Sequence, residues 1–170
     1  MAATAPMHIP VDIVVPVYNE EQAVATLHQQ LCQVIDQLVA YRFTITYVND
    51  GSSDSTQEIL LQLAAGDERV VVLELSRNFG HQAALTAGLD HSTAPYVITM
   101  DGDGQHPPSL LPEMLHLAQA GYDVVIGQRI EDRTPFFKNL TSRLFYRIIN
   151  LIGETSIQPG AADFRLLSRQ

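Results

Sequence analysis

Short apolar runs that alternate with helical patterns constrain the fold of this chain more than any other feature of its sequence. Three of these runs are rich in β-branched residues, at 11–17, 43–48 and 70–75, and two more lie at 96–100 and 123–127. Short, nearly all-apolar strands are typical of a parallel sheet that is buried on both faces. The alternation therefore predicts an α/β fold, with helices on both faces of a mostly parallel sheet.

Helical spacing of apolar residues connects the predicted strands. The predicted helices begin after Asn19, after Asp54, at His81 and at Pro107. At the first two starts a glutamine follows three residues later, which is the spacing of a capping box. Gly66 and Gly121 are expected near the ends of the second and fourth helices, where glycine commonly stops a helix.

The charge of the chain excludes one class of function and favours another. A net charge of -9 argues against a nucleic-acid binder held by its overall charge. Residues 1–128 carry three of the ten basic and 15 of the 19 acidic residues, whereas residues 129–170 carry the other seven basic and four acidic residues. A basic end on an acidic body suggests that an anionic ligand binds near that end.

The single cysteine and the ends of the chain add limits of a different kind. Cys32 alone cannot form a disulfide framework or a cysteine metal cluster, and its apolar helical context predicts a core position. Residues 1–10 lack the pattern of a signal peptide and are expected to be a disordered leader before one domain at 11–170. No apolar run approaches the roughly 20 residues of a membrane-spanning helix, so a cytoplasmic location is expected.

Polar clusters follow four of the predicted strands, at 18–20, 49–51, 76–80 and 101–103. Ligands of open parallel sheets bind beyond the carboxyl ends of the strands. All four clusters are therefore expected to line one edge of the sheet.

Asp101 and Asp103 form the most informative of these clusters. Side chains two residues apart in an extended segment point to the same side, so the two carboxylates can converge on one point. Paired carboxylates suit Mg²⁺ or Mn²⁺ that also contacts a ligand's phosphates. The alternative is a loop whose aspartates cap turns.

Other candidates at this edge also allow two readings. Asp50 fits either a turn into the next helix or an acceptor for a nucleotide base, and Glu20 and Glu21 complement a helix dipole. The loop at 76–80 either offers backbone N–H groups to an anion or is an ordinary strand-to-helix connection. His106 fits a loop residue better than a metal ligand.

The chain lacks GxGxxG after its first strand, GxxxxGK[ST], GxSxG and HExxH, which removes support for several other enzyme classes. The segment at 136–152 is amphipathic and contains Lys138, Arg143 and Arg147. It fits either an ordinary core-packing helix or a surface for lipid headgroups.

Five motifs in order, VVPVYNEEQAV, VNDGSSDST, SRNFGHQAALTAGL, MDGDGQHPP and GQRIEDR, resemble the family 2 glycosyltransferases with the GT-A, Rossmann-like fold. The resemblance extends over about 11–169. It is strongest to the polyprenyl-phosphate glycosyltransferases, such as dolichol-phosphate mannose synthase and its bacterial glucosyl relatives. Compared with that family, the chain is expected to be truncated at its C-terminus, so that 11–170 is an incomplete catalytic domain.

The resemblance assigns expected roles to particular residues. It places Pro16, Tyr18, Glu20, Asp50, Phe79, Gly80, Asp101 and Gln105 around the nucleotide sugar. It gives Mg²⁺ or Mn²⁺ to Asp103 and Asp101, and catalytic roles to Asp101, Asp103 and Arg129. It places Arg129, Arg133, Asp163 and Arg165 at the acceptor phosphate. The chain departs from the family at Gly102 and Gly104, where alanine and leucine are common, and at His81, where lysine is common.

The resemblance also implies an activity, which is inverting transfer of a sugar from a nucleotide sugar of the UDP-glucose or GDP-mannose type to a polyprenyl phosphate. The expected location is peripheral, at the cytoplasmic face of a membrane, with no nucleic-acid partner, and a homo-oligomer is one of the assemblies left open. Two alternatives remain, a nucleotide-sugar-binding domain with little or no turnover and a family 2 transferase with a different acceptor. A nucleotidyltransferase is disfavoured because a Gly-rich basic loop does not follow the first strand.

Overall fold

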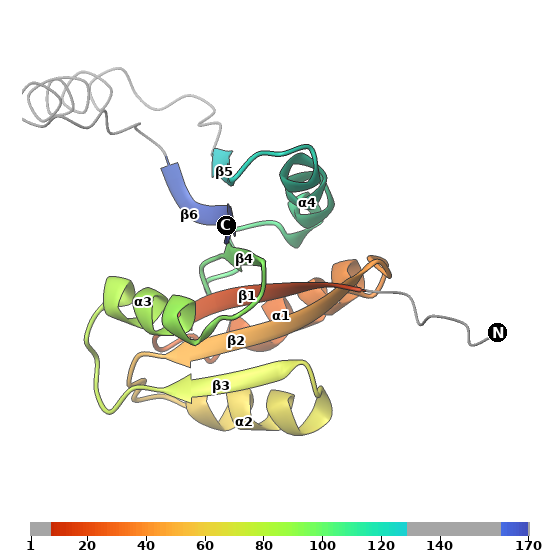
Figure 1. Ribbon diagram of the computed structural model, residues 1–170. Helices are drawn as coiled ribbons and strands as arrows, with labels where there is room; N and C mark the ends of the chain where they lie inside the picture. The colour runs from red at the N-terminus through yellow and green to blue at the C-terminus, as the bar shows by residue number, and fades with distance from the viewer. Residues whose placement is uncertain (1–7, 129–160, 170) are drawn as a thin grey trace, which may run out of the picture.

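A computed structural model describes residues 8–128 and 161–169 of this chain, which form a six-stranded sheet with helices on both faces (Figure 1). The strands are β1 (Ile9–Val17), β2 (Tyr41–Asn49), β3 (Val70–Glu74), β4 (Tyr96–Thr99), β5 (Val124–Gln128) and β6 (Ala161–Ser168). The helices are α1 (Val24–Ile35), α2 (Thr56–Gly66), α3 (His81–His91), a 3₁₀ turn η1 (Pro108–Leu110) and α4 (Leu111–Gln119). The five predicted strands and four predicted helices are confirmed within a few residues.

The order of the sheet is β3-β2-β1-β4-β6-β5, and it explains where a ligand site can form. β1 pairs in parallel with both β2 and β4, so the chain builds outward on one side of β1 and then crosses to the other. The carboxyl ends of β1 and β4 are therefore the topological switch point, where open α/β sheets hold their ligands.

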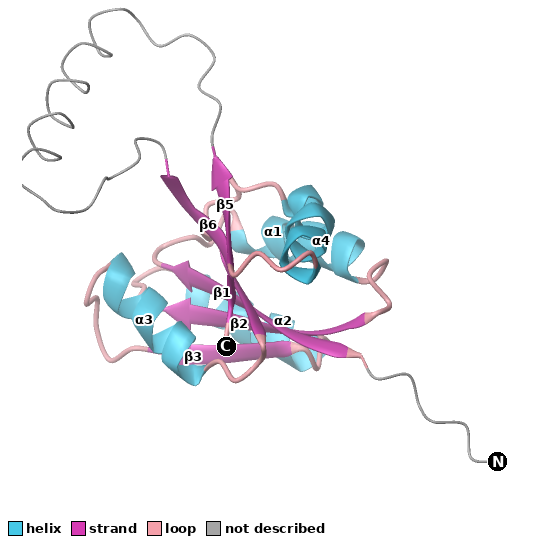
Figure 2. Ribbon diagram, turned by 45° about the horizontal axis from the view of Figure 1, so that its top comes forward, coloured by secondary structure: helices cyan, strands magenta, loops and turns pink. Residues whose placement is uncertain are grey.

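β6 is a strand that the sequence analysis did not predict. It is antiparallel to both of its neighbours, β4 and β5, so the sheet is mixed (Figure 2). Its sequence, AADFRLLS, is a weak strand pattern with charged residues in the middle. Pairing on both sides fixes β6 in the sheet, a long-range effect that a local pattern does not contain.

Two apolar clusters hold the layers together. Alternate residues of β1 pack with α1, α2 and α4 on one face, around Leu27, Leu60 and Leu115. Val14 of β1 packs with Ala84 and Leu85 of α3 on the other face. The near-continuous burial of β1 follows from this double coverage and explains why its sequence is apolar throughout.

Asp12 is a buried charge inside this apolar strand, and its environment satisfies it. Its Oδ2 accepts hydrogen bonds from the Ser92 hydroxyl at 2.6 Å and from the backbone N–H groups of Thr93 and Ala94 at 3.0 and 3.1 Å. The carboxylate thus anchors the end of α3 to β1, which fixes that helix over the site edge.

Neither of the two predicted capping boxes is present in the structure. Asp54 accepts a hydrogen bond from the Thr56 backbone N–H at 3.0 Å, but the N-cap residue of α2 is Ser55, which has no side-chain cap. The Gln57 side chain bonds Asn49 and Glu74 instead of closing the box. The Asn19 prediction is wrong, because α1 begins only at Val24 and has no side-chain cap. Asn19 instead adopts a left-handed conformation with φ of 55°, which asparagine tolerates.

Three sequence predictions fall wholly or partly outside the described residues. These are the leader at 1–10, of which only His8 to Pro10 are described, the basic residues Arg129 and Arg133, and the amphipathic segment at 136–152. Within the described ranges, no helix combines the length and apolar character needed to cross a bilayer.

Candidate functional site

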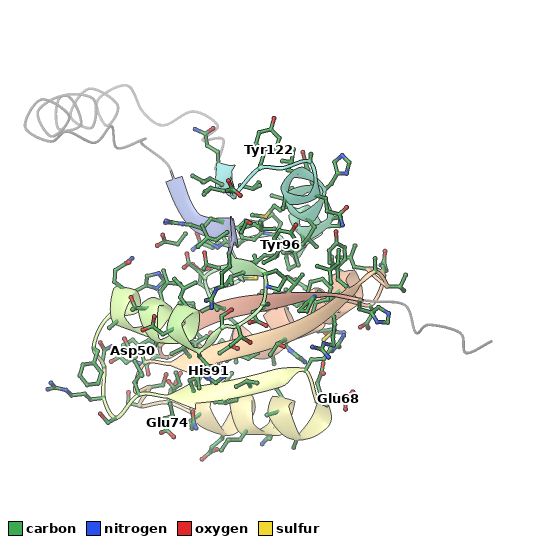
Figure 3. All side chains as sticks on the ribbon, viewed as in Figure 1. Asp50, Glu68, Glu74, His91, Tyr96 and Tyr122 are labelled. Atoms are coloured by element: carbon green, nitrogen blue, oxygen red, sulfur yellow. The ribbon has the colours of Figure 1, made fainter. Side chains whose placement is uncertain are left out.

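A cavity of about 400 Å³ opens at the carboxyl edge of the sheet, at the switch point between β1 and β4. Its lining comes from the four strand ends that the sequence marked as polar, and from β6. The lining residues are Pro16, Val17, Tyr18, Glu20, Asp50, Asn78, Gly80, His81, Ala84, Asp101, Gly102, Asp103 and Asp163. Figure 3 labels Asp50 at this edge, where the arrows of β2 and β3 end. The prediction that the polar clusters share one edge is confirmed.

Reciprocal hydrogen bonds lock the loop after β1 to the loop after β2. The Asn19 backbone N–H donates to Ser52 Oγ at 2.9 Å, and Asn19 Oδ1 accepts from the Ser53 N–H at 2.8 Å. The Glu20 N–H donates to Thr56 Oγ1 at 2.8 Å. These contacts fix the Glu20 backbone and leave its carboxylate facing the cavity, so this wall is set by backbone geometry.

Asp50 is 3 % exposed and fixes a third loop. Its two carboxylate oxygens accept the backbone N–H groups of Phe79 and Gly80 at 2.8 and 2.9 Å. The adjoining Gly51 has φ of +67°, and a Cβ there would lie 2.4 Å from the Arg77 carbonyl carbon. The two loops therefore meet backbone to backbone, which only glycine permits at this position.

The loop that carries Asp101 and Asp103 is held by a buried histidine. The Asp101 backbone N–H donates to His106 Nδ1 at 3.0 Å, and the His106 ring stacks on Phe164 with centroids 5.2 Å apart. This bond requires an unprotonated Nδ1, so a neutral His106 carries its proton on Nε2. Its role is to shape the loop, in agreement with the reading of His106 as a loop residue.

Gly102 packs closely between the two aspartates. A Cβ at this position would lie 2.5 Å from Val17 Cγ1 and 3.0 Å from the Pro16 carbonyl oxygen. Gly102 lets the loop approach the end of β1, which brings the two strand ends together.

β6 brings an acidic side chain to the site from a distant part of the sequence. Thr99 Oγ1 donates to the Asp163 carbonyl oxygen at 2.7 Å and ties β6 to the end of β4. The Asp163 carboxylate pairs through Oδ1 with Arg165, and its Oδ2 lies 3.2 Å from His81 Nε2. His81 is the first residue of α3, so helix and strand meet at this point.

The cavity is strongly acidic. Five carboxylates line it, from Glu20, Asp50, Asp101, Asp103 and Asp163, and none of its described lining residues is lysine or arginine. Partial burial raises the pKa of Glu20, as do the carboxylates of Asp103, Asp54 and Asp101. The site therefore has an excess of negative charge that a cation would relieve.

The donor atoms in the cavity fit a metal ion. His81 Nε2, Asp101 Oδ1 and Asp163 Oδ2 belong to a group whose ligand atoms lie within 4.8 Å of one another. Asp101 Oδ1 is buried and has no hydrogen-bond partner among the described residues. An orphaned buried carboxylate oxygen is unfavourable unless a cation or water satisfies it.

Most residues singled out from the sequence gather at this cavity, and the rest lie elsewhere. Those that line it are Pro16, Tyr18, Glu20, Asp50, Gly80, Asp101, Asp103 and Asp163. Phe79 is half exposed beneath the Arg77 guanidinium, and Arg165 pairs with Asp163. Gln105 lines a second cavity of about 170 Å³ with His106 and Phe164.

Three of the lining residues lie outside the polar clusters and the site residues expected from the sequence. These are Val17, His81 and Ala84. His81 and Ala84 are three positions apart on α3 and therefore share a face, a spacing that could have indicated both. The packing of Gly102 against Val17 left no signal in the local sequence.

Comparison with known proteins agrees with this geometry. The sequence profile of the family described as glycosyl transferase family 2 matches residues 12–170. An uncharacterised glycosyltransferase of Bacillus subtilis, YkcC, is 40% identical over 164 residues, which cover 96% of this chain and 50% of that protein. A bactoprenol glucosyl transferase of Shigella phage SfX is 39% identical over 161 residues, covering 94% and 52%. The chain thus spans about half the length of these curated relatives.

A solved structure shows the same fold. The mannosyltransferase of Pyrobaculum calidifontis, in complex with GDP-Man and Mn²⁺, superposes with a TM-score of 0.65 and 19% identity, over 98% of this chain and 47% of that one. At this identity the likeness concerns the fold alone, which is the GT-A arrangement expected from the sequence. With a family match over nearly its whole length and relatives near 40% identity, the chain belongs to glycosyl transferase family 2.

Proposed function

We propose that this chain binds a nucleotide sugar in the acidic cavity and takes part in sugar transfer to a polyprenyl phosphate, with inversion at the anomeric carbon. The observation that carries the proposal is the set of five carboxylates at the switch point, which suits a diphosphate bound through a divalent cation. The name of the phage relative, bactoprenol glucosyl transferase, supports transfer of a glucosyl group to a polyprenyl acceptor, and we propose a donor of the UDP-glucose or GDP-mannose type.

The residues of this chain would divide the binding between them. Pro16, Tyr18 and Asp50 lie at the ends of β1 and β2 and would hold the base and ribose. Asp101 and Asp103 would hold Mg²⁺ or Mn²⁺, which when bound supplies positive charge that offsets the departing diphosphate. His106 and Gly102 would keep this loop close to the end of β1.

The transfer step needs little acid–base chemistry. An oxygen of the acceptor phosphate attacks the anomeric carbon from the face opposite the diphosphate, and the bond from that carbon to the diphosphate oxygen breaks. The leaving group departs as a nucleoside diphosphate, and an already ionised acceptor has no proton to lose. The protein would therefore act mainly by alignment and charge stabilisation.

The acceptor side would lie toward β6 and the basic residues that follow β5. Asp163, Arg165, Arg129 and Arg133 are the candidates there, and seven of the ten basic residues fall within 129–170. A polyprenyl chain resides in a membrane, so we place the protein at the cytoplasmic membrane surface, where basic residues also attract anionic headgroups.

Calorimetric titration tests the donor site. UDP, GDP, UDP-glucose and GDP-mannose are titrated with and without Mn²⁺ into the protein, into Asp103→Ala and into a matched control, Asp90→Ala, at an exposed aspartate near the end of α3. We expect Mn²⁺-dependent binding of one nucleotide, lost in Asp103→Ala and kept in the control. Equal binding by both variants would refute the site.

A second measurement separates transfer from binding alone. Nucleoside diphosphate release is followed with the bound donor and a polyprenyl phosphate in detergent, against a detergent-only control. Release that depends on the acceptor supports the proposed transfer. Binding without release favours a nucleotide-sugar-binding domain, and release with other acceptors alone favours a different family 2 transferase.

A further inference from the structure

We propose that His81, Asp101 and Asp163 form a cation site of their own, with one nitrogen and two oxygen ligands, on the β6 side of Asp101. Nothing in the family resemblance assigns His81 or Asp163 to a metal. The existence of the site stands on geometry, and only its role beside the acceptor phosphate rests on the proposed function.

The spacing of the three donor atoms carries the argument. His81 Nε2 lies 3.6 Å from Asp101 Oδ1 and 3.2 Å from Asp163 Oδ2. In a tetrahedral site with bonds of about 2.1 Å, neighbouring ligand atoms are about 3.4 Å apart. The two spacings from His81 therefore match neighbouring positions of a coordination shell, and Asp101 Oδ1 and Asp163 Oδ2 lie within 4.8 Å of each other. The remaining positions would be open for water or a ligand.

Each of the two carboxylates directs one oxygen toward this point. Asp101 Oδ1 is buried without a hydrogen-bond partner, and at 3.6 Å from His81 it is beyond hydrogen-bond reach. Asp163 uses Oδ1 for Arg165 and presents Oδ2 to His81. A cation between them would satisfy the orphaned oxygen that the surrounding protein leaves unpaired.

Asp103 stands apart from this group. It is exposed, and its Oδ1 accepts the Gln105 backbone N–H at 2.9 Å. It is not a member of the cluster whose ligand atoms lie within 4.8 Å of one another. Asp101 would therefore contribute to two neighbouring sites. With Asp103 it would face the nucleotide, and with His81 and Asp163 it would face β6.

An imidazole ligand changes which ions the site prefers. All-oxygen sites suit Mg²⁺ and Mn²⁺, whereas a nitrogen ligand favours Zn²⁺, Co²⁺ and Ni²⁺. A cation there would also explain why Asp163 can lie near an anionic acceptor phosphate, which a bare carboxylate would repel. The expected role is to hold that phosphate beside the sugar.

The experiment measures metal binding without any nucleotide. Co²⁺ is titrated into the full 170-residue chain and followed by visible absorption, and Zn²⁺ and Mg²⁺ are followed by calorimetry. The variants are His81→Gln and Asp163→Asn. The matched controls are His91→Gln at the exposed far end of the same helix and Asp90→Asn beside it.

We expect His81→Gln and Asp163→Asn each to weaken Co²⁺ and Zn²⁺ at least about tenfold, with Mg²⁺ changed less than about threefold in His81→Gln. The controls should remain within twofold of the parent protein. Co²⁺ affinity within twofold of the parent in both cluster variants would overturn the proposal. So would intense near-ultraviolet thiolate absorption that disappears in Cys32→Ser, because it would place the ion at His28 and Cys32.

Two further measurements keep the result interpretable. A circular dichroism melt on each variant separates loss of the ion from loss of the fold. Nucleotide binding on the same samples separates this proposal from the proposed function, since Asp103→Ala should lose the nucleotide and keep Co²⁺ at the His81 cluster. If the parent protein binds Co²⁺ through His81 but binds no nucleotide, the proposed function is refuted and this cation site stands.

Discussion

Two clusters in the described part of this molecule place a histidine beside carboxylates. They differ in whether an arginine of the protein pairs with all of the acidic groups or leaves a carboxylate oxygen unpaired. The closed cluster, His28, Cys32, Asp67 and Arg69, lies between α1 and the start of β3. Arg69 Nη2 lies 2.7 Å from Asp67 Oδ2 and 3.3 Å from Cys32 Sγ. The Cys32 sulfur and the Asp67 carboxylate, two of the three groups that could hold a metal here, are therefore already bound to a guanidinium.

The open cluster, His81, Asp101 and Asp163, lies at the opposite edge of the sheet and lines the cavity. Glu68, beside the closed cluster, and Asp50, beside the open one, are labelled at these two ends in Figure 3. Arg165 reaches only one oxygen of Asp163 in the open cluster, and Asp101 Oδ1 is unpaired.

This difference in charge pairing suggests that the closed cluster stabilises the fold and the open cluster binds a ligand. Hydrogen bonds from Arg69 lower the pKa of Asp67 to about 2, and burial lowers the pKa of His28 and raises that of the Cys32 thiol. These pKa shifts favour a charged carboxylate beside a neutral imidazole and a neutral thiol. The negative charge of Asp67 is then paired within the protein by Arg69, as in a structural ion pair. The open cluster leaves negative charge unpaired, as a site for a cationic ligand does.

The largest expected difference between the two clusters is in nucleotide affinity, when one aspartate of each cluster is replaced by asparagine. Asp101→Asn should weaken Mn²⁺-dependent nucleotide binding about 100-fold, equivalent to about 2.7 kcal/mol, because the neutral amide no longer balances the ion. Asp67→Asn should leave the affinity within twofold. Calorimetric titration measures both, and equal losses in the two variants would remove the distinction between the clusters.

For the free energy of unfolding, the order of the two variants should be reversed. Asp67→Asn should lower the free energy of unfolding at pH 7 by about 2 kcal/mol, since the lowered pKa of Asp67 measures what its ionised form gains in the fold. Asp101→Asn should change it by no more than about 0.5 kcal/mol. Chemical denaturation of the three proteins at one pH provides the comparison.

The pH dependence sharpens this second prediction. A carboxyl with a depressed pKa stabilises the fold fully above its ordinary value of 3.8, and that stability is lost as the pH falls toward about 2. The gap between the parent and Asp67→Asn should therefore be constant from pH 5 to 8 and close below about pH 4. A gap that persists at pH 2 would point to a packing defect.

The smallest expected effect concerns Glu20, at the open edge. Its raised pKa means that the ionised form is disfavoured in the fold, so stability is lost as the pH rises above its ordinary value of 4.5. Without metal, Glu20→Gln should raise the free energy of unfolding at pH 7 by on the order of 0.5 kcal/mol. Thermal melts at pH 4 and 7 check the sign, with Glu58→Gln on α2 as the control.

Local patterns in the sequence determined the frame of the fold and the composition of one site edge. Each buried strand had to be apolar, and each parallel strand had to end at the same edge, so the positions of Asp50, Asp101 and Asp103 followed from the alternation alone. These features are readable because they depend on neighbours within a few residues.

The tertiary structure decided what those residues contact. The sequence offered Asp50 either as a turn residue or as a base acceptor, and the structure adds a contact that neither interpretation contained, because each of its oxygens accepts a backbone N–H from Phe79 or Gly80. Gly102 packs closely against Val17 at the end of β1. Neither outcome was available locally, because each depends on a partner tens of residues away.

The placement of β6 is the clearest case of this division. Its sequence is a weak strand pattern, yet pairing with β4 and β5 inserts it into the sheet and sets Asp163 beside His81, 82 positions away in the chain. The sequence thus determined which strand ends are polar. Only long-range strand pairing decided which of those polar groups meet, because the free energy of that pairing belongs to both strands and is not encoded in either one.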